Sequence, residues 1–90
     1  MTVLIHIPPF LQNLAGNETL VEVDSGTVGD CLEELVRRFP AVRERLFGED
    51  GGISSKVQVF INGASAYPGE LSRPAGSGDT ITVTSVMVGG

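Results

Sequence analysis

The sequence has 90 residues, a formal net charge of −5 and 41% hydrophobic residues, which suits one small globular domain. A domain of this size buries only about 60–65% of its unfolded surface, so a deep cavity that encloses a substrate is not expected. Its six Lys and Arg residues form no basic stripe, so we expect neither nucleic acid nor an anionic membrane surface as a partner.

Cysteine and histidine are scarce. Cys31 is the single cysteine, which excludes an internal disulfide and a cysteine-rich metal site. His6 is the single histidine, and we expect no bound metal. The first residues lack the charged and apolar segments of a signal peptide, and the apolar runs are too short to span a bilayer. We therefore expect a cytoplasmic protein.

The first part of the chain predicts two strands. Residues 3–7 form a β-branched run that stops at Pro8-Pro9, because proline cannot continue a ladder. Residues 19–23 alternate between apolar and polar side chains and precede a turn at residues 24–26.

A helix is expected to begin after Thr27, which can cap it together with Asp30 in a variant of the capping box. Apolar side chains then recur at helical spacing, whereas charged side chains take the other face, until Pro40 ends the helix. Cys31 falls within the apolar stripe, so we interpret it as a buried core residue and not as a nucleophile. The stripe consists of Val28, Cys31, Leu32, Leu35, Val36 and Phe39.

The second part predicts a short helix over residues 40–47, a strand over residues 56–61 and a last strand over residues 80–88. Asn62-Gly63 is the pair most typical of a two-residue hairpin turn, and we expect the return segment around Ala66-Tyr67. These elements describe one α+β domain over residues 1–90, with one main helix packed across one face of a sheet.

Side-chain alternation predicts a docking patch on the open face of this sheet. If Val57, Val59 and Ile61 point to the helix, Phe60 points to solvent. In the first strand, Leu4 and His6 alternate with Val3, Ile5 and Ile7, so they lie on the outer face. We expect Phe60, Leu4 and His6 to share the open face and to contact a partner protein.

The sequence closes on Gly89-Gly90, directly after the last predicted strand. Glycine has no side chain, so two in a row can form a flexible tail that enters a narrow channel and presents a carboxylate there. No pair of carboxylates elsewhere has a spacing suited to acid–base catalysis. We therefore expect that the chain is not an enzyme and that a partner performs the chemistry on it.

The chain resembles the ubiquitin-like sulfur carriers of the MoaD/ThiS family, because four features occur in the same order. These features are Thr27-Val28, the hairpin at residues 59–63, the turn at Gly78-Asp79 and the terminal Gly89-Gly90. The resemblance covers essentially the whole chain. It implies a β-grasp fold with a mixed sheet of about four to five strands.

The same resemblance implies the chemistry of the tail. An ATP-dependent, ubiquitin-activating-type adenylyltransferase would adenylate the carboxylate of Gly90, and a sulfur donor would convert the adenylate to a thiocarboxylate. Gly89 would keep the approach to Gly90 narrow. The chain itself would bind no cofactor, because ATP is used by the activating partner.

A second implied partner is a sulfur-acceptor enzyme, such as a molybdopterin synthase large subunit. The product could be molybdopterin, cysteine or homocysteine, or another sulfur-containing metabolite. Val86, Met87 and Val88 would contact these partners. Carriers for molybdopterin usually have a Pro-Pro-Val-type segment where this chain has residues 85–88, which weakens that assignment. Two alternatives stay open: a modifier joined to lysines through Gly90, and a non-catalytic β-grasp interaction module.

Overall fold

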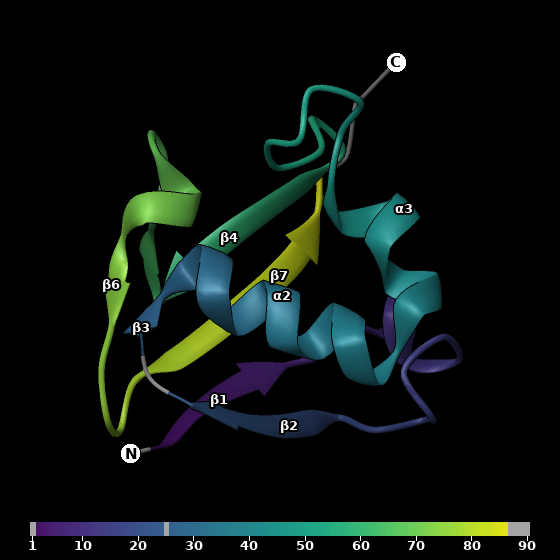
Figure 1. Ribbon diagram of the computed structural model, residues 1–90, viewed down its shortest axis with the longest axis horizontal. Helices are drawn as coiled ribbons and strands as arrows, with labels where there is room; N and C mark the ends of the chain where they lie inside the picture. The colour runs from purple at the N-terminus through teal and green to yellow at the C-terminus, as the bar shows by residue number, and fades with distance from the viewer. Residues whose placement is uncertain (1, 25, 87–90) are drawn as a thin grey trace.

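A computed structural model describes residues 2–24 and 26–86. Its centre is a five-stranded mixed sheet with the main helix, α2 (Val28–Arg38), lying across one face (Figure 1). The strand order is β2-β1-β7-β4-β5, in which β1 and β7 are parallel and the other neighbours are antiparallel. The predicted α+β architecture is confirmed. The strands are β1 (Thr2–His6), β2 (Leu20–Asp24), β4 (Val57–Ile61), β5 (Ala64–Ser65) and β7 (Thr80–Ser85).

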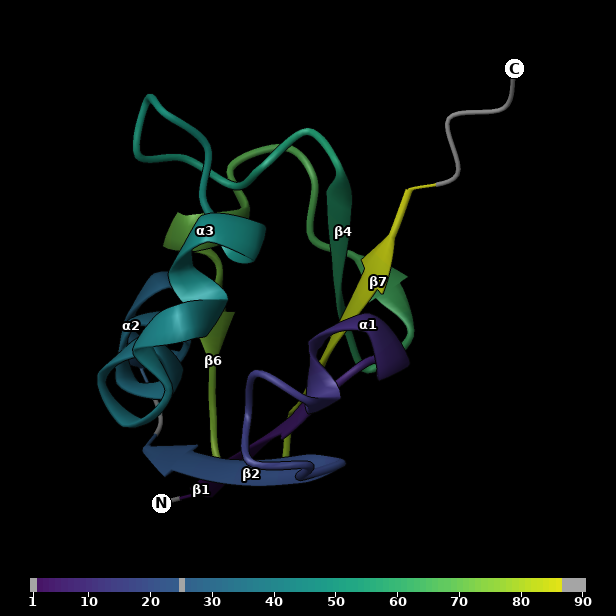
Figure 2. The same cartoon turned by 90° about the vertical axis from the view of Figure 1, so that its right-hand side faces the viewer.

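Smaller elements close the ends of this core. A short helix α1 (Pro9–Gln12) follows β1, and a 3₁₀ turn (Pro40–Val42) leads into α3 (Arg43–Leu46). Another 3₁₀ turn, η2 (Glu70–Ser72), precedes a ribbon of β3 (Gly26–Thr27) and β6 (Pro74–Ala75). Figure 2 shows α2 and α3 on the same side of β4 and β7.

The start of α2 has the predicted capping box. The Thr27 hydroxyl accepts a hydrogen bond from the Asp30 N–H at 3.1 Å, and the Asp30 carboxylate accepts one from the Thr27 N–H at 3.1 Å. The apolar stripe of the helix then packs on the inward side chains of β1, β4 and β7. Cys31 is fully buried in this core, as predicted.

Three features differ from the sequence-based prediction. The return strand is β5 (Ala64–Ser65) and not a segment around Ala66-Tyr67, because a two-residue turn pairs Ile61 directly with Ala64. Pro8-Pro9 ends β1 as expected but also begins α1, since proline is well suited to the first position of a helix. The β3–β6 ribbon was not predicted, since two-residue strands leave no periodic pattern.

Candidate functional site

β7 is paired with both neighbouring strands in its first half and with β4 alone at its end. β1 pairs with Thr80 to Thr82, and β4 pairs with Ile81 to Ser85. The N–H of Val86 then donates to the Lys56 carbonyl at 2.9 Å. Val86 is therefore a fixed point four positions before the end of the sequence. The predicted site residues Met87, Val88, Gly89 and Gly90 lie outside the described residues, so their roles stay predictions.

The hairpin between β4 and β5 is tied to the start of β7. Asn62 and Gly63 have the positive φ angles, +51° and +84°, that a primed hairpin turn requires. The Asn62 side chain donates to the Asp79 carboxylate at 2.9 Å and accepts from the Thr80 N–H at 2.9 Å. These contacts join the end of β4 to the start of β7 and so help to fix the register of the two strands.

The strand register brings the predicted docking residues onto one face. Phe60 and His6 both lie opposite Thr82, one from each side of β7. Leu4 lies one step along β1, beside Thr80. Phe60 and Leu4 are half-buried and His6 is exposed. The predicted placement on the open face is thus observed, whereas a role in partner binding stays a prediction.

Leu20 belongs to the same face and was not predicted there. It pairs with His6 and is 48% exposed, so it extends the row of side chains to the edge strand β2. The alternation within residues 19–23 contained this signal, because Leu20 has the opposite parity to the buried Val21 and Val23. We call Leu20, His6, Thr82, Phe60 and Ser65, in spatial order across the sheet, the open-face row.

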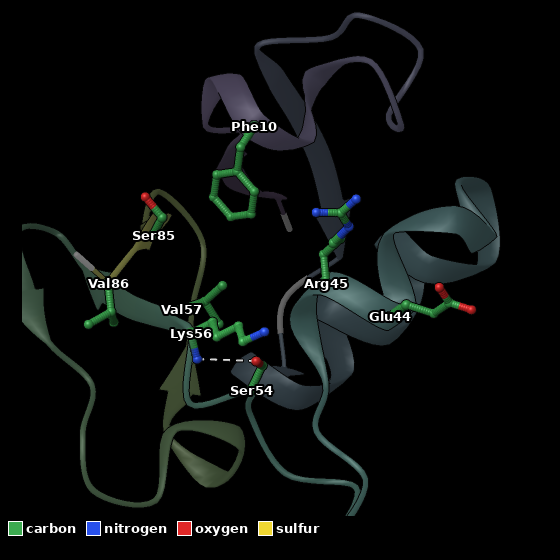
Figure 3. Close-up of a pocket in the computed structure, with 8 residues that line it drawn as sticks. All are labelled: Phe10, Glu44, Arg45, Ser54, Lys56, Val57, Ser85 and Val86. Carbon is green, nitrogen blue, oxygen red and sulfur yellow. Dashed lines mark hydrogen bonds between the residues drawn. The ribbon is translucent and has the colours of Figure 1, made fainter. Parts of the chain in front are cut away.

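A pocket of about 660 Å³ opens beside Val86, where β7 ends (Figure 3). Four separate parts of the chain build it: α1, α3, the segment before β4 and the end of β7. Arg45 and Lys56 point into the space between these parts, while the carboxylate of Glu44 points away from it. The hydroxyl of Ser54 accepts a hydrogen bond from the Lys56 N–H at 3.2 Å and so fixes the backbone under the lysine. The lining residues are Phe10, Glu44, Arg45, Ser54, Lys56, Val57, Ser85 and Val86.

The thiol of Cys31 is unsuited to chemistry. Burial, followed by the negative charges of Asp30, Glu34 and Asp24, raises its pKa to about 11. The thiol donates to the Asp24 carbonyl at 3.3 Å. Because the thiolate is the reactive form, this cysteine is inert at neutral pH, in agreement with its interpretation as a core residue.

Residues 2–24 and 26–86 contain no group of three or more His, Cys, Asp or Glu side chains placed to hold a metal ion. Within the same ranges, no helix has the length and apolar character needed to cross a membrane. The features that stand out are therefore surfaces: the open-face row, and the pocket beside the root of the tail.

Comparisons with known proteins agree with this description. No protein-family model matches the sequence. Small archaeal modifier protein 1 from Haloferax volcanii is 38% identical over 82 residues, which cover 89% of this chain and 91% of the relative. The crystal structure of that Haloferax volcanii protein superposes with a TM-score of 0.84 and 31% identity, over 100% of both chains.

A second solved structure is also similar over nearly its whole length. A chain of the Amycolatopsis orientalis BexX/CysO complex superposes with a TM-score of 0.87 and 27% identity, over 98% of this chain and 99% of that one. The chain therefore belongs to the family of ubiquitin-like small modifiers and sulfur carriers, and its fold is the β-grasp. As a member of that family it is a carrier or modifier and not itself an enzyme.

Proposed function

We propose that this protein is a sulfur carrier whose reacting group is the carboxylate of Gly90. The observation that carries the proposal is the fixed position of Val86 at the end of the central strand β7, four positions before Gly90 in the sequence. Four residues span at most about 14 Å. An enzyme that docks on the folded body can therefore receive the tail in a nearby channel, and the glycines fit a narrow one.

The chemistry follows from the low reactivity of a carboxylate. In the cytoplasm, an ATP-dependent activating enzyme would join the Gly90 carboxylate to the α-phosphorus of ATP and release pyrophosphate. A donor of sulfur at the oxidation level of sulfide would then displace AMP and leave a thiocarboxylate. The chain binds no cofactor in this scheme, because the activating enzyme binds the ATP.

Two protein partners are implied: the ubiquitin-activating-type enzyme and an acceptor enzyme that takes the sulfur. Support comes from the Amycolatopsis orientalis relative, which was crystallised in the BexX/CysO complex. We propose that Phe60 and His6 of the open-face row, and Leu4 on the same face, contact these partners together with Val86, Met87 and Val88. The acceptor would make molybdopterin, cysteine or homocysteine, or another sulfur-containing metabolite.

A second function, conjugation to other proteins, has a specific observation in its favour. The Haloferax volcanii relative is a modifier by name, and the same adenylate serves both functions. Attack by a lysine amine on the Gly90 adenylate would form an isopeptide bond and release AMP. The two functions differ in the nucleophile and not in the activation step.

Intact-mass spectrometry tests the proposal. The protein is co-expressed with the activating enzyme of its own source and a sulfur donor, after that enzyme is shown to release pyrophosphate in the presence of the protein. We expect a mass increase equal to the exchange of one oxygen for one sulfur, and its absence from a variant that lacks Gly90. Pyrophosphate release without the mass increase would contradict the sulfur-carrier function, and isopeptide-linked products in the same sample would favour the modifier.

A further inference from the structure

The pocket beside Val86 contains two positively charged side chains in a protein that is negatively charged as a whole. The sequence has a net charge of −5 and six Lys and Arg residues. Two of the six, Arg45 and Lys56, line this one pocket. Their side chains come from different elements and point into the same space, which Phe10 closes on the opposite side (Figure 3).

Neither cation is neutralised within the described part of the chain. Arg38 pairs with Glu34 and Arg43 pairs with Glu33, but Arg45 and Lys56 form no ion pair with any residue in 2–24 or 26–86. Glu44, the acidic residue of the lining, directs its carboxylate away from both (Figure 3). Two like charges that share a concavity attract an anion more strongly than either does alone.

The rest of the lining, apart from Glu44, combines apolar side chains with the hydroxyls of Ser54 and Ser85. Phe10, Val57 and Val86 contribute a ring and two branched side chains next to the cations. Such a lining fits a side chain that is larger and less polar than an inorganic ion, and it displaces water, which strengthens the attraction between charges. An arginine also matches a carboxylate with two parallel hydrogen bonds.

We propose that this pocket receives an acidic segment with an apolar side chain, presented by the protein that takes the tail. This inference rests on the proposed function, because it assigns the occupant to the partner that binds Gly89-Gly90. Val86 is both part of the lining and the last residue tied to the sheet. A partner that holds the tail therefore lies against the pocket as well, and its carboxylates meet Arg45 and Lys56.

A peptide titration tests the pocket without the partner. The probe is a blocked pentapeptide, Glu-Asp-Phe-Asp-Glu, and its matched control is Gln-Asn-Phe-Asn-Gln. In NMR spectra of the labelled full chain we expect the acidic peptide alone to shift the amide signals of Phe10, Arg45, Lys56 and Val86. Added salt should weaken the effect. Equal shifts from both peptides, or shifts spread over the sheet, would overturn the proposal.

Charge reversal gives the second test. Arg45→Glu and Lys56→Glu are compared with Arg37→Glu, which makes the same change of charge on the exposed side of α2. We expect each pocket variant to lose the peptide response and to lower kcat/KM of the activating enzyme by about 10-fold. For Arg37→Glu, the peptide response and kcat/KM should match those of the unchanged protein. Melting temperatures verify that all three variants fold.

The outcomes separate the two proposals. If the unchanged protein acquires no thiocarboxylate and no conjugate, the proposed function fails, while the peptide titration still decides whether the pocket binds acidic segments. If the unchanged protein is activated but Arg45→Glu and Lys56→Glu behave like Arg37→Glu, the proposed function stands and the pocket is not a contact site.

Discussion

Asn62 in the hairpin turn and Asp79 before β7 hold each other through a hydrogen bond of 2.9 Å from the Asn62 amide to the Asp79 carboxylate. The second oxygen of Asp79 accepts from the Gly76 N–H at 2.8 Å. One exposed carboxylate thus fastens the turn that starts β7 to the turn that ends β4. The bond from Gly76, followed by that from Asn62, lowers the pKa of Asp79 below its usual value.

This pKa shift predicts how stability depends on pH. In the unfolded chain Asp79 has the ordinary pKa of an aspartate, and its folded pKa is lower. Its contribution is therefore complete above the unfolded pKa and is lost as the pH falls through the folded pKa. We expect Asp79→Ala to lower the melting temperature at neutral pH and to flatten the loss of stability in acid.

Urea unfolding at a series of pH values between neutrality and acid measures this effect. Glu34 also has a lowered pKa, chiefly through the N–H of Asp24 and then through Arg38, so part of the acid dependence persists in the Asp79 variant. Glu34→Gln serves as the control, because it removes the part of the acid dependence that comes from Glu34. Identical acid slopes for Asp79→Ala and the unchanged protein would contradict the prediction.

The buried thiol gives a second prediction. Cys31→Ala should lower the free energy of unfolding by about 1 kcal/mol, because it removes one small packed group. Sulfur transfer should be unchanged. In the folded protein, iodoacetamide should label Cys31 slowly, and in urea it should label quickly. Loss of transfer in a folded Cys31→Ala protein would show that the thiol takes part in the chemistry.

Gly29 gives a third prediction, because replacing a helical glycine by alanine usually stabilises a protein by up to about 1 kcal/mol. A Cβ at this position would lie 2.9 Å from the carbonyl oxygen of Leu71 in η2. Relieving that contact requires α2 and η2 to separate. We expect Gly29→Ala to lower the free energy of unfolding by about 1–2 kcal/mol, measured by urea denaturation. A stabilised variant would mean that η2 moves freely.

Phe60 gives the fourth prediction. Interface energy concentrates in a few large side chains, each contributing roughly 2 kcal/mol or more, so Phe60→Ala should weaken binding to the activating enzyme about 30-fold. Phe60 is half-buried on the open face, so the melting temperature of the Phe60→Ala protein should fall only slightly. Calorimetric titration gives the dissociation constant.

Tyr67→Ala is the matched control for Phe60→Ala. Tyr67 is also aromatic, is 73% exposed and lies outside the open-face row. Its loss should leave binding unchanged. Equal effects of the two substitutions would remove Phe60 from the interface, and a large fall in the melting temperature of Phe60→Ala would make it a core residue.

Periodic features were predictable from the sequence. The helix stripe around Cys31 and the alternation around Phe60 each repeat several times, so single exceptions do not hide them. The Asn62-Gly63 turn was also readable, because few residue pairs accept two positive φ angles. These features determine the fold and place Phe60, Leu4 and His6 on one face.

Contacts between distant segments were not predictable in this way. Arg45 and Lys56 look like two isolated surface charges in the sequence, since they belong to different elements and follow no common period. Their convergence depends on the path from α3 to β4, which local patterns do not encode. The bond between Asn62 and Asp79 was hidden for the same reason, although each residue was recognised as part of a turn.

The position of Lys56 has one more consequence, because it is the only lysine in the sequence. If copies of this protein were joined to one another through side-chain amines, every link would have the same geometry. Each link would also cover the pocket of the copy that accepts it, next to that copy's own Val86. Such a polymer would be uniform, and its growth would compete with docking of the enzyme that activates the next unit.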